Sequence, residues 1–268
     1  MLSKPTLIHK ARKRFGQNFL IDQGIIQHIV RSIRPKETDN IIEIGPGKGA
    51  ITSLLIDECP NLQVVELDRD LVPILLAQFA TYPNFKIHQT DALKFDFGQL
   101  ATEQPLRVVG NLPYNISTPL IFHLLSFQQQ IRDMHFMLQK EVVDRLAAAP
   151  GDKNYGRLSV MTQYYCQVEW LFDVPPESFR PMPKVNSAIV RLTPHQQLPY
   201  IADNIDHLKQ LVTAAFSQRR KTLRNALKPL LENFDGDIPL DLSRRAESVS
   251  LEEYVQASNA MTQQSTTL

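Results

Sequence analysis

Cysteine and tryptophan are scarce in this sequence, with two cysteines and one tryptophan among 268 residues. The two thiols are too few for a disulfide framework, which favours a reducing, cytoplasmic setting. No uninterrupted apolar run is as long as a membrane span requires, so we expect no membrane contact. The seven histidines form no pair at helical ligand spacing, and no Cys-x-x-Cys occurs, so we expect no bound metal.

Net charge is also nearly absent, at +1, which by itself argues against a nucleic-acid partner. The distribution of charge argues the other way. Residues 1–34, a basic N-terminal arm, carry seven Lys or Arg against one acid, and residues 217–228 carry five against none. Seven acids after residue 229 hide both patches in the sum. Clustered cations are typical of phosphate binding, although two solvated faces are the alternative.

Residues 40–52, N-I-I-E-I-G-P-G-K-G-A-I-T, form the stretch around which the chain is organised. A strand-like apolar run leads into Gly45, Gly47 and Gly49, and an apolar helical pattern follows. Glycines at such a turn let the backbone approach a ligand closely, which predicts a nucleotide-type pocket. The loop fits both the dinucleotide fingerprint and the E-x-G-x-G-x-G loop of S-adenosylmethionine (SAM)-dependent methyltransferases, and it does not choose between them.

Polar residues follow the next predicted strands. Glu66 ends the strand predicted at 62–67, where an ionised carboxylate can accept both ribose hydroxyls. Asp91 follows the short strand at 85–88 and could take an adenine amino group, with an ordinary turn residue as the alternative. Asn18 and the Leu20 backbone precede the domain and are placed over the mouth of the pocket, with a simple N-cap region as the alternative.

The remaining elements complete an α/β pattern. Further strands are expected at 41–44, 107–109 and 131–138, with 167–174 and 187–192 closing the sheet as an antiparallel pair. Helices are expected at 25–33, 51–56, 71–79 and 141–149, and after a linker at 208–216, 223–231 and 251–260.

The segment 106–118, L-R-V-V-G-N-L-P-Y-N-I-S-T, decides between the two cofactors. Nicotinamide chemistry has no evident use for its Asn-Leu-Pro-Tyr corner (residues 111–114), whereas methylation of adenine N6 does. The exocyclic amine is a poor nucleophile, and two acceptors, the Asn111 side-chain oxygen and the Leu112 carbonyl, can activate it. Pro113 stiffens the turn, and Tyr114 offers a face for stacking of a splayed-out base.

Six segments carry a resemblance to a known family. They are F-G-Q-N-F-L from residue 15, E-I-G-P-G-K-G-A from 43, V-V-E-L-D from 64, N-L-P-Y-N-I-S-T-P from 111, L-Q-K-E-V from 138 and F-R-P-M-P-K-V-N-S from 179. In this order, over nearly the whole chain, they resemble the KsgA/RsmA family of small-subunit (16S) rRNA adenine N6,N6-dimethyltransferases. Segments 155–160 and 245–247 look more like the small-subunit branch than like relatives that methylate large-subunit rRNA.

The resemblance implies a site residue by residue. Together with Gly47 of the loop, the SAM pocket would use Asn18, Leu20, Gly45, Glu66, Asp91 and Asn111. The target adenine would meet Asn111, Leu112 and Tyr114, with Phe179 stacking on its other face. From the residues alone Phe179 sits in a stiff proline-rich loop, and core packing is the alternative. The resemblance does not supply the RNA contacts. The charge pattern does, because it predicts that RNA phosphates contact Arg219, Arg220, Lys221 and Arg224 of the helical domain.

The sequence therefore predicts a Rossmann-like class I SAM-dependent methyltransferase domain over 1–197, mostly parallel with an antiparallel closing strand, and a small all-helical RNA-binding domain over 198–268. The expected reaction is dimethylation of two adjacent adenosines near the 3′ end of 16S rRNA, by a monomer acting on a pre-ribosomal particle. Alternatives are a large-subunit rRNA methyltransferase of the resistance type, a nicotinamide-dependent oxidoreductase, and an RNA-binding assembly or transcription factor that retains the pocket. The intact corner at 111–114 argues against the last.

Overall fold

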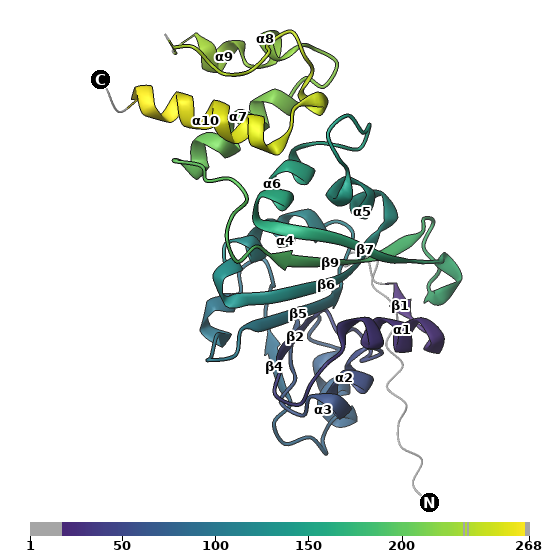
Figure 1. Ribbon diagram of the computed structural model, residues 1–268. Coiled ribbons are helices and arrows are strands. Elements are labelled where there is room, and N and C mark those ends of the chain that lie inside the picture. The colour runs from purple at the N-terminus through teal and green to yellow at the C-terminus, as the bar shows by residue number, and fades with distance from the viewer. Residues whose placement is uncertain (1–17, 233, 235, 266–268) are drawn as a thin grey trace, which may run out of the picture. The chain divides into compact units, whose positions relative to one another are not determined.

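The computed structural model describes residues 18–232, 234 and 236–265 (Figure 1). The chain divides into two compact units, Met1–Val143 with Glu169–Pro194, and Asp144–Val168 with His195–Leu268. The predicted boundary at residue 197 kept 144–168 in the first domain, whereas the structure groups this segment with the C-terminal helices. The basic arm before residue 18 lies outside the described residues.

The first unit is built on a seven-stranded sheet with strand order β4-β3-β2-β5-β6-β9-β7. The strands are β2 (Asn40–Ile44), β3 (Gln63–Glu66), β4 (Lys86–Gln89), β5 (Leu106–Asn111), β6 (Ile131–Gln139), β7 (Cys166–Val174) and β9 (Ser187–Pro194). The pairs from β4 through β6 are parallel, and β9 runs antiparallel to β6. The predicted mostly parallel sheet with an antiparallel closing strand is confirmed.

The first unit also holds the helices α1 (Gln23–Ile33), α2 (Thr52–Glu58), α3 (Val72–Gln78) and α4 (Ser117–Leu125), with short 3-10 turns η2 (Phe97–Leu100), η3 (Gln128–Gln130) and η4 (Pro176–Ser178). Helix α5 (Lys140–Ala147) begins in the first unit and ends in the second. Side chains of α1, α2 and α3 share one core cluster with Ile41 and Val64 of the sheet. Their strand neighbours Ile42 and Val65 are buried too. Because successive strand side chains point to opposite faces, both faces of the sheet are covered.

A two-stranded ribbon joins two distant parts of the sequence. In it, β1 (Phe19–Leu20) pairs antiparallel with β8 (Phe179–Arg180), and the backbone N–H of Ile21 donates to the Ser178 carbonyl at 2.8 Å. The side chains of Leu20 and Phe179 are both buried in the core cluster. The ribbon therefore anchors the start of the described chain to the first unit.

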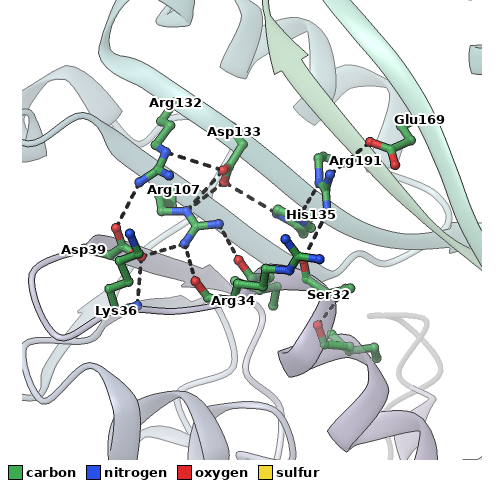
Figure 2. Close-up of polar contacts among 12 residues, drawn as sticks. Ser32, Arg34, Lys36, Asp39, Arg107, Arg132, Asp133, His135, Glu169 and Arg191 are labelled. Carbon is green, nitrogen blue, oxygen red and sulfur yellow. Dashed lines mark hydrogen bonds and ion pairs between the residues drawn. The ribbon is translucent and has the colours of Figure 1, made fainter.

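A buried ionic network secures the end of α1 to the sheet (Figure 2). Arg107 of β5 donates to the Ile33 carbonyl at 2.6 Å, to Asp39 at 2.6 Å and to Asp133 at 3.0 Å. Arg191 of β9 donates to the Ser32 carbonyl at 3.1 Å. Two arginines thus satisfy carbonyl groups in the last turn of α1, which lack partners inside the helix.

The second unit is helical. It holds α6 (Arg157–Tyr165), α7 (Ile205–Phe216), α8 (Leu223–Ala226), α9 (Lys228–Leu231), η5 (Ala246–Ser248) and α10 (Leu251–Ser265). Asn204 caps α7 by accepting from the backbone N–H groups of Asp206 and His207. The hydroxyl of the buried Tyr254 donates to the Ala246 carbonyl at 2.9 Å, which ties α10 to the preceding turn.

Three helical segments differ from the sequence predictions. The predicted helix at 223–231 is two short helices, because Pro229 lies in the first turn of α9 and cannot extend the hydrogen-bond ladder of α8. Helices α4 and α6 were not predicted, since their residues were interpreted only as motif segments. Within the described part of the chain, no helix has both the length and the apolar character needed to cross a membrane.

Candidate active site

One cavity lies at the carboxyl ends of the parallel strands in the first unit. Four turns line it, and they follow β2, β3, β4 and β5 in turn, while β1 adds a fifth wall. Open α/β sheets bind ligands at this edge. The cavity brings together nearly all of the residues predicted to bind SAM or adenine, namely Asn18, Leu20, Gly45, Gly47, Glu66, Asp91, Asn111, Leu112 and Tyr114.

The glycine loop after β2 has a backbone that requires glycine. The φ angles of Gly45, Gly47 and Gly49 are +66°, +59° and +78°, in the left-handed region that other residues rarely adopt. A Cβ on Gly47 would also lie 3.2 Å from the ring of Phe19. The loop is therefore closely packed against β1 on one side while it lines the cavity on the other.

The side chain of Glu43 links the two ends of this loop. Its side chain is 1% exposed and accepts a 2.6 Å hydrogen bond from the hydroxyl of Thr52, the first residue of α2. Burial raises the pKa of Glu43 to about 7, although the Thr52 hydrogen bond opposes the shift. The carboxyl group thus ties the end of β2 to the start of α2. No role was predicted for it from the sequence, although it opens the glycine motif.

Glu66 ends β3 at the cavity wall. Its carboxylate accepts a 2.7 Å hydrogen bond from the backbone N–H of Asp68, and a backbone N–H of Gly47 also contributes. Burial raises the pKa of Glu66 to about 7 against these hydrogen bonds. The glycine loop and the ribose-binding candidate are therefore linked directly. Asp68 also lines the cavity, and it was not among the predicted site residues.

Asp91 lies in the turn after β4. One of its carboxylate oxygens accepts from the backbone N–H of Leu93 at 3.0 Å, which fixes the side chain in an Asx turn at the cavity wall. A carboxylate held in this way is suited to accept a hydrogen bond from an amino group.

The Asn-Leu-Pro-Tyr corner follows β5 directly. The Asn111 amide nitrogen donates to the Asn18 carbonyl at 3.2 Å, so the amide oxygen is the acceptor end of the side chain. The backbone N–H of Leu112 donates to the Met137 carbonyl at 3.2 Å, and the Ile116 N–H closes the turn on the Pro113 carbonyl at 3.1 Å. The Asn111 side chain and the backbone at Leu112, which carry the two predicted acceptors, are therefore both held by hydrogen bonds.

Gly110, just before the corner, has a packing role that the sequence did not reveal. A Cβ at this position would lie 2.7 Å from the Ile44 carbonyl oxygen, closer than real Cβ contacts allow. Only glycine lets β5 approach the end of β2 here. The glycine loop and the corner are consequently brought to adjacent parts of one sheet edge.

Phe179, predicted to stack on the target base, packs in the core in this structure, and its stacking role stays a prediction. Its side chain is 1% exposed and belongs to the hydrophobic core cluster, and it is not among the described residues that line the cavity. Its strand β8 pairs with β1, so core packing, the alternative weighed from the sequence, is what the structure describes. Phe19, which was not predicted, lines the cavity instead, with the Lys48 ammonium 4.8 Å from its ring centroid.

The four predicted RNA contacts lie in the second unit, three in the turn after α7 and one in α8. All are exposed: Arg219, Arg220, Lys221 and Arg224. Arg219 differs from the others because its guanidinium donates to the carbonyls of Lys153 at 2.6 Å and Tyr155 at 3.2 Å. The other three project from the same segment. Among the described residues no group of His, Cys, Asp and Glu is arranged to hold a metal.

The sheet order, the glycine loop after β2, the buried acid at the end of β3 and the corner after β5 together define a Rossmann-like methyltransferase domain. Comparison with known proteins narrows this class. The chain matches the family described as "Ribosomal RNA adenine dimethylase" over residues 8–263 and belongs to that family. It is thus a methyltransferase.

Individual relatives agree with this assignment. The chain is 74% identical over 255 residues to "Ribosomal RNA small subunit methyltransferase A" of Saccharophagus degradans, covering 94% of this chain and 95% of that protein. It is similar to a dimethyladenosine transferase from Plasmodium falciparum, with 26% identity, a TM-score of 0.73, and coverage of 89% and 95%. The 23S rRNA methyltransferase ErmE shares the fold at 23% identity and a TM-score of 0.67, with coverage of 91% and 100%.

Proposed function

We propose that this protein transfers methyl groups from SAM to the N6 atoms of two adjacent adenosines near the 3′ end of small-subunit (16S) rRNA. One observation carries the proposal: the Asn-Leu-Pro-Tyr corner and the glycine loop line the same cavity. The choice of the small subunit is supported by the printed name of the 74% identical relative.

The residues of the cavity fit SAM by their chemistry. Glu66, when ionised, offers two oxygens to the ribose hydroxyls, and Asp91 offers an acceptor to the adenine amino group. The backbone at Gly45 and Gly47 allows close approach, and the β1 wall closes the cavity near Asn18. When bound, SAM supplies a methyl group activated by a sulfonium sulfur.

The corner binds and activates the target amine. We assign the Asn111 side-chain oxygen and the Leu112 carbonyl as acceptors for the two N–H groups of adenine N6. These contacts localise the nitrogen lone pair, and because the acceptors are fixed in advance they cost little reorganisation during the reaction. Tyr114 stacks on one face of the flipped base. Once alkylated, the nitrogen is strongly acidic and its proton passes to water, so no dedicated base is needed.

The exposed cations of the second unit hold the RNA. Arg220, Lys221 and Arg224 would contact phosphates, which positions the substrate and makes affinity depend on salt. Arg219 would contribute less, since its guanidinium already binds two carbonyl groups. We place the protein in the cytoplasm as a monomer acting on a pre-ribosomal particle, where small-subunit rRNA is still accessible.

Methylation of purified ribosomal subunits tests the proposal. Labelled SAM is incubated with small and large subunits from a strain that lacks these methyl groups, and modified nucleotides are mapped by mass spectrometry. We expect N6,N6-dimethyladenosine at two adjacent positions near the 3′ end of small-subunit rRNA. Transfer to large subunits only, or to no RNA while SAM still binds, would overturn the proposal.

A further inference from the structure

Tyr114 is held from outside its own loop. Its phenolic oxygen lies 3.1 Å from the hydroxyl oxygen of Ser187, within hydrogen-bond distance. Tyr114 is half-buried at the cavity wall, whereas Ser187 is 1% exposed. The two residues are 73 positions apart in the sequence and belong to the same compact unit.

The backbone around Ser187 is rigid. Ser187 begins β9, and its register partner on β6 is Gln139. One residue earlier, the Asn186 carbonyl accepts a 2.9 Å hydrogen bond from the backbone N–H of Lys140. The Ser187 hydroxyl is therefore presented by a strand that is fixed on both sides of this position.

The hydrogen bonds within the loop of Tyr114 fix the Tyr114 backbone but not its side chain. The Tyr114 carbonyl accepts a 3.2 Å hydrogen bond from the Ser117 hydroxyl, and the turn closes between Pro113 and Ile116. These bonds leave rotation about the two side-chain torsions of Tyr114 open. A contact at the far end of the ring removes that freedom, because it fixes the phenol oxygen as well as the Cα.

We infer that Ser187 is a positioning residue for the target base, acting through Tyr114. It fixes the plane of the Tyr114 ring, and so the plane in which a flipped adenine stacks, relative to Asn111 and the Leu112 carbonyl. Stacking depends strongly on ring orientation, and a tilt of the base moves N6 away from both acceptors. This inference rests on the proposed function, since it assumes that Tyr114 meets the base.

A double-mutant cycle tests it. Ser187→Ala and Tyr114→Phe each remove one hydroxyl of the pair, and methyl transfer to undermethylated small subunits is measured in single turnover. We expect each variant to lower the transfer rate about 3- to 10-fold, the factor that one net hydrogen bond is worth. The double variant should be no slower than the slower single variant, because the second change removes nothing further. SAM affinity in calorimetry should be unchanged throughout.

Ser178→Ala is the matched control. Ser178 is also 1% exposed in the same unit, and its hydroxyl has no hydrogen-bond partner among the described residues. Its transfer rate should equal that of the wild type. If Ser187→Ala does not fold, Tyr114→Phe alone still tests the contact, since it removes the bond from the half-buried side.

Two results would overturn the inference while leaving the proposed function intact. One is a wild-type rate in Tyr114→Phe or in folded Ser187→Ala. The other is fully additive losses in the double variant. Failure of the proposed function looks different, because wild-type protein would then transfer no methyl groups to small subunits.

Discussion

Glu43 and Glu66 are both buried beside the glycine loop, and burial raises the pKa of each to about 7. Each carboxyl therefore changes its protonation near pH 7. For Glu43 this should affect stability, because the buried side chain favours the protonated form. For Glu66 it should also affect ligand binding, because in the proposed role the ionised form accepts hydrogen bonds from a ribose.

Glu43→Gln should remove one part of the pH dependence of stability. Between about pH 4.5 and 7 the Glu43 carboxyl is protonated in the folded protein but ionised in the unfolded chain. The stability that this difference provides is therefore fully present below pH 4.5 and is lost as the pH rises through 7. Its size is up to about 3 kcal/mol, at about 1.4 kcal/mol per pKa unit. Glutamine keeps an acceptor for Thr52. Urea unfolding at pH 5 and pH 8 should show the variant gaining on the wild type at pH 8; parallel profiles would contradict this.

Glu66 should make SAM binding depend on pH. In its proposed role the ionised carboxylate accepts from the ribose, so affinity should fall as pH drops below about 7 and approach a tenfold loss per pH unit well below it. Calorimetry in Glu66→Ala should show affinity about 10- to 100-fold weaker, the loss of hydrogen bonds to a charged group. Glu58→Ala, at an exposed glutamate that ends α2, is the control. Unchanged affinity in Glu66→Ala would refute the ribose role.

Asn111→Ala should slow methyl transfer by about 10²–10³, the usual effect of losing one preorganised polar contact to the reacting group. The Leu112 carbonyl would remain, but the amine would lose its second acceptor. Single-turnover transfer to undermethylated small subunits measures the effect, and calorimetry with SAM separates it from loss of the cofactor. Turnover near that of the wild type would remove the acceptor argument.

The lining of the cavity was largely predictable residue by residue. The glycine loop, Glu66, Asp91 and the corner at 111–114 each follow a parallel strand. The carboxyl ends of these strands meet at one edge of the sheet, so the local sequence pattern predicts that the residues lie together. The core position of Phe179 could not be predicted, because a short sequence window does not show which side of a ribbon a ring occupies. Phe19 and Gly110 were missed for a related reason: their roles depend on close contacts with Gly47 and with Ile44, which the fold alone creates.

At the scale of elements, Arg107 is the most buried of the polar links between α1 and the sheet. Arg107 is 4% exposed and contacts Asp39, Asp133 and the Ile33 carbonyl (Figure 2). Arg107→Met should destabilise the protein by about 3–5 kcal/mol, because it leaves two acids without their buried partner. Denaturant unfolding at neutral pH measures the loss.

Arg132→Ala is the matched control for that prediction. Arg132 binds the other oxygen of Asp39 at 3.1 Å, but its side chain is 51% exposed. Its removal should cost less than about 1 kcal/mol, as for other exposed ion pairs. Equal losses in the two variants would show that burial does not decide the energetics of this network.

Most elements of the first unit could be predicted, because apolar runs and glycine breaks are local signals. The ribbon of β1 and β8 could not, since each strand is two residues long and neither has a pattern of its own. Arg107 could be interpreted only as the start of a strand. Its partners lie 26 to 74 residues away, so their meeting depends on the sheet order rather than on the segment itself.

At the scale of the whole molecule, near-neutral net charge conceals a local patch. Arg220→Glu and Arg224→Glu should each weaken RNA binding and reduce the slope of log affinity against log salt by about 0.7–0.9 for every phosphate that is no longer neutralised. Filter binding across a salt series measures this. Lys86→Glu is the control, because it reverses the charge of an exposed lysine on β4, outside the patch, and should leave the slope unchanged. An unaltered slope in the arginine variants would mean that the patch is only solvated.

The division into units shows what pattern cannot supply. Segment 144–168 lies between predicted strands of the first domain, and sequence order therefore places it there. In the structure it clusters with residues after 195, and Arg219 binds carbonyls of Lys153 and Tyr155 within it. This grouping arises from long-range packing, which the order of segments along the sequence does not predict.

The ribbon of β1 with β8 has a consequence for biosynthesis. The wall of the cavity at Asn18 to Leu20 is synthesised well before its partner strand, which ends at Arg180. Until that strand has emerged from the ribosome, the β1 wall of the cavity lacks its pairing partner. Nascent or truncated chains ending before residue 179 should therefore bind SAM more weakly than the full chain in calorimetry, however complete their glycine loop.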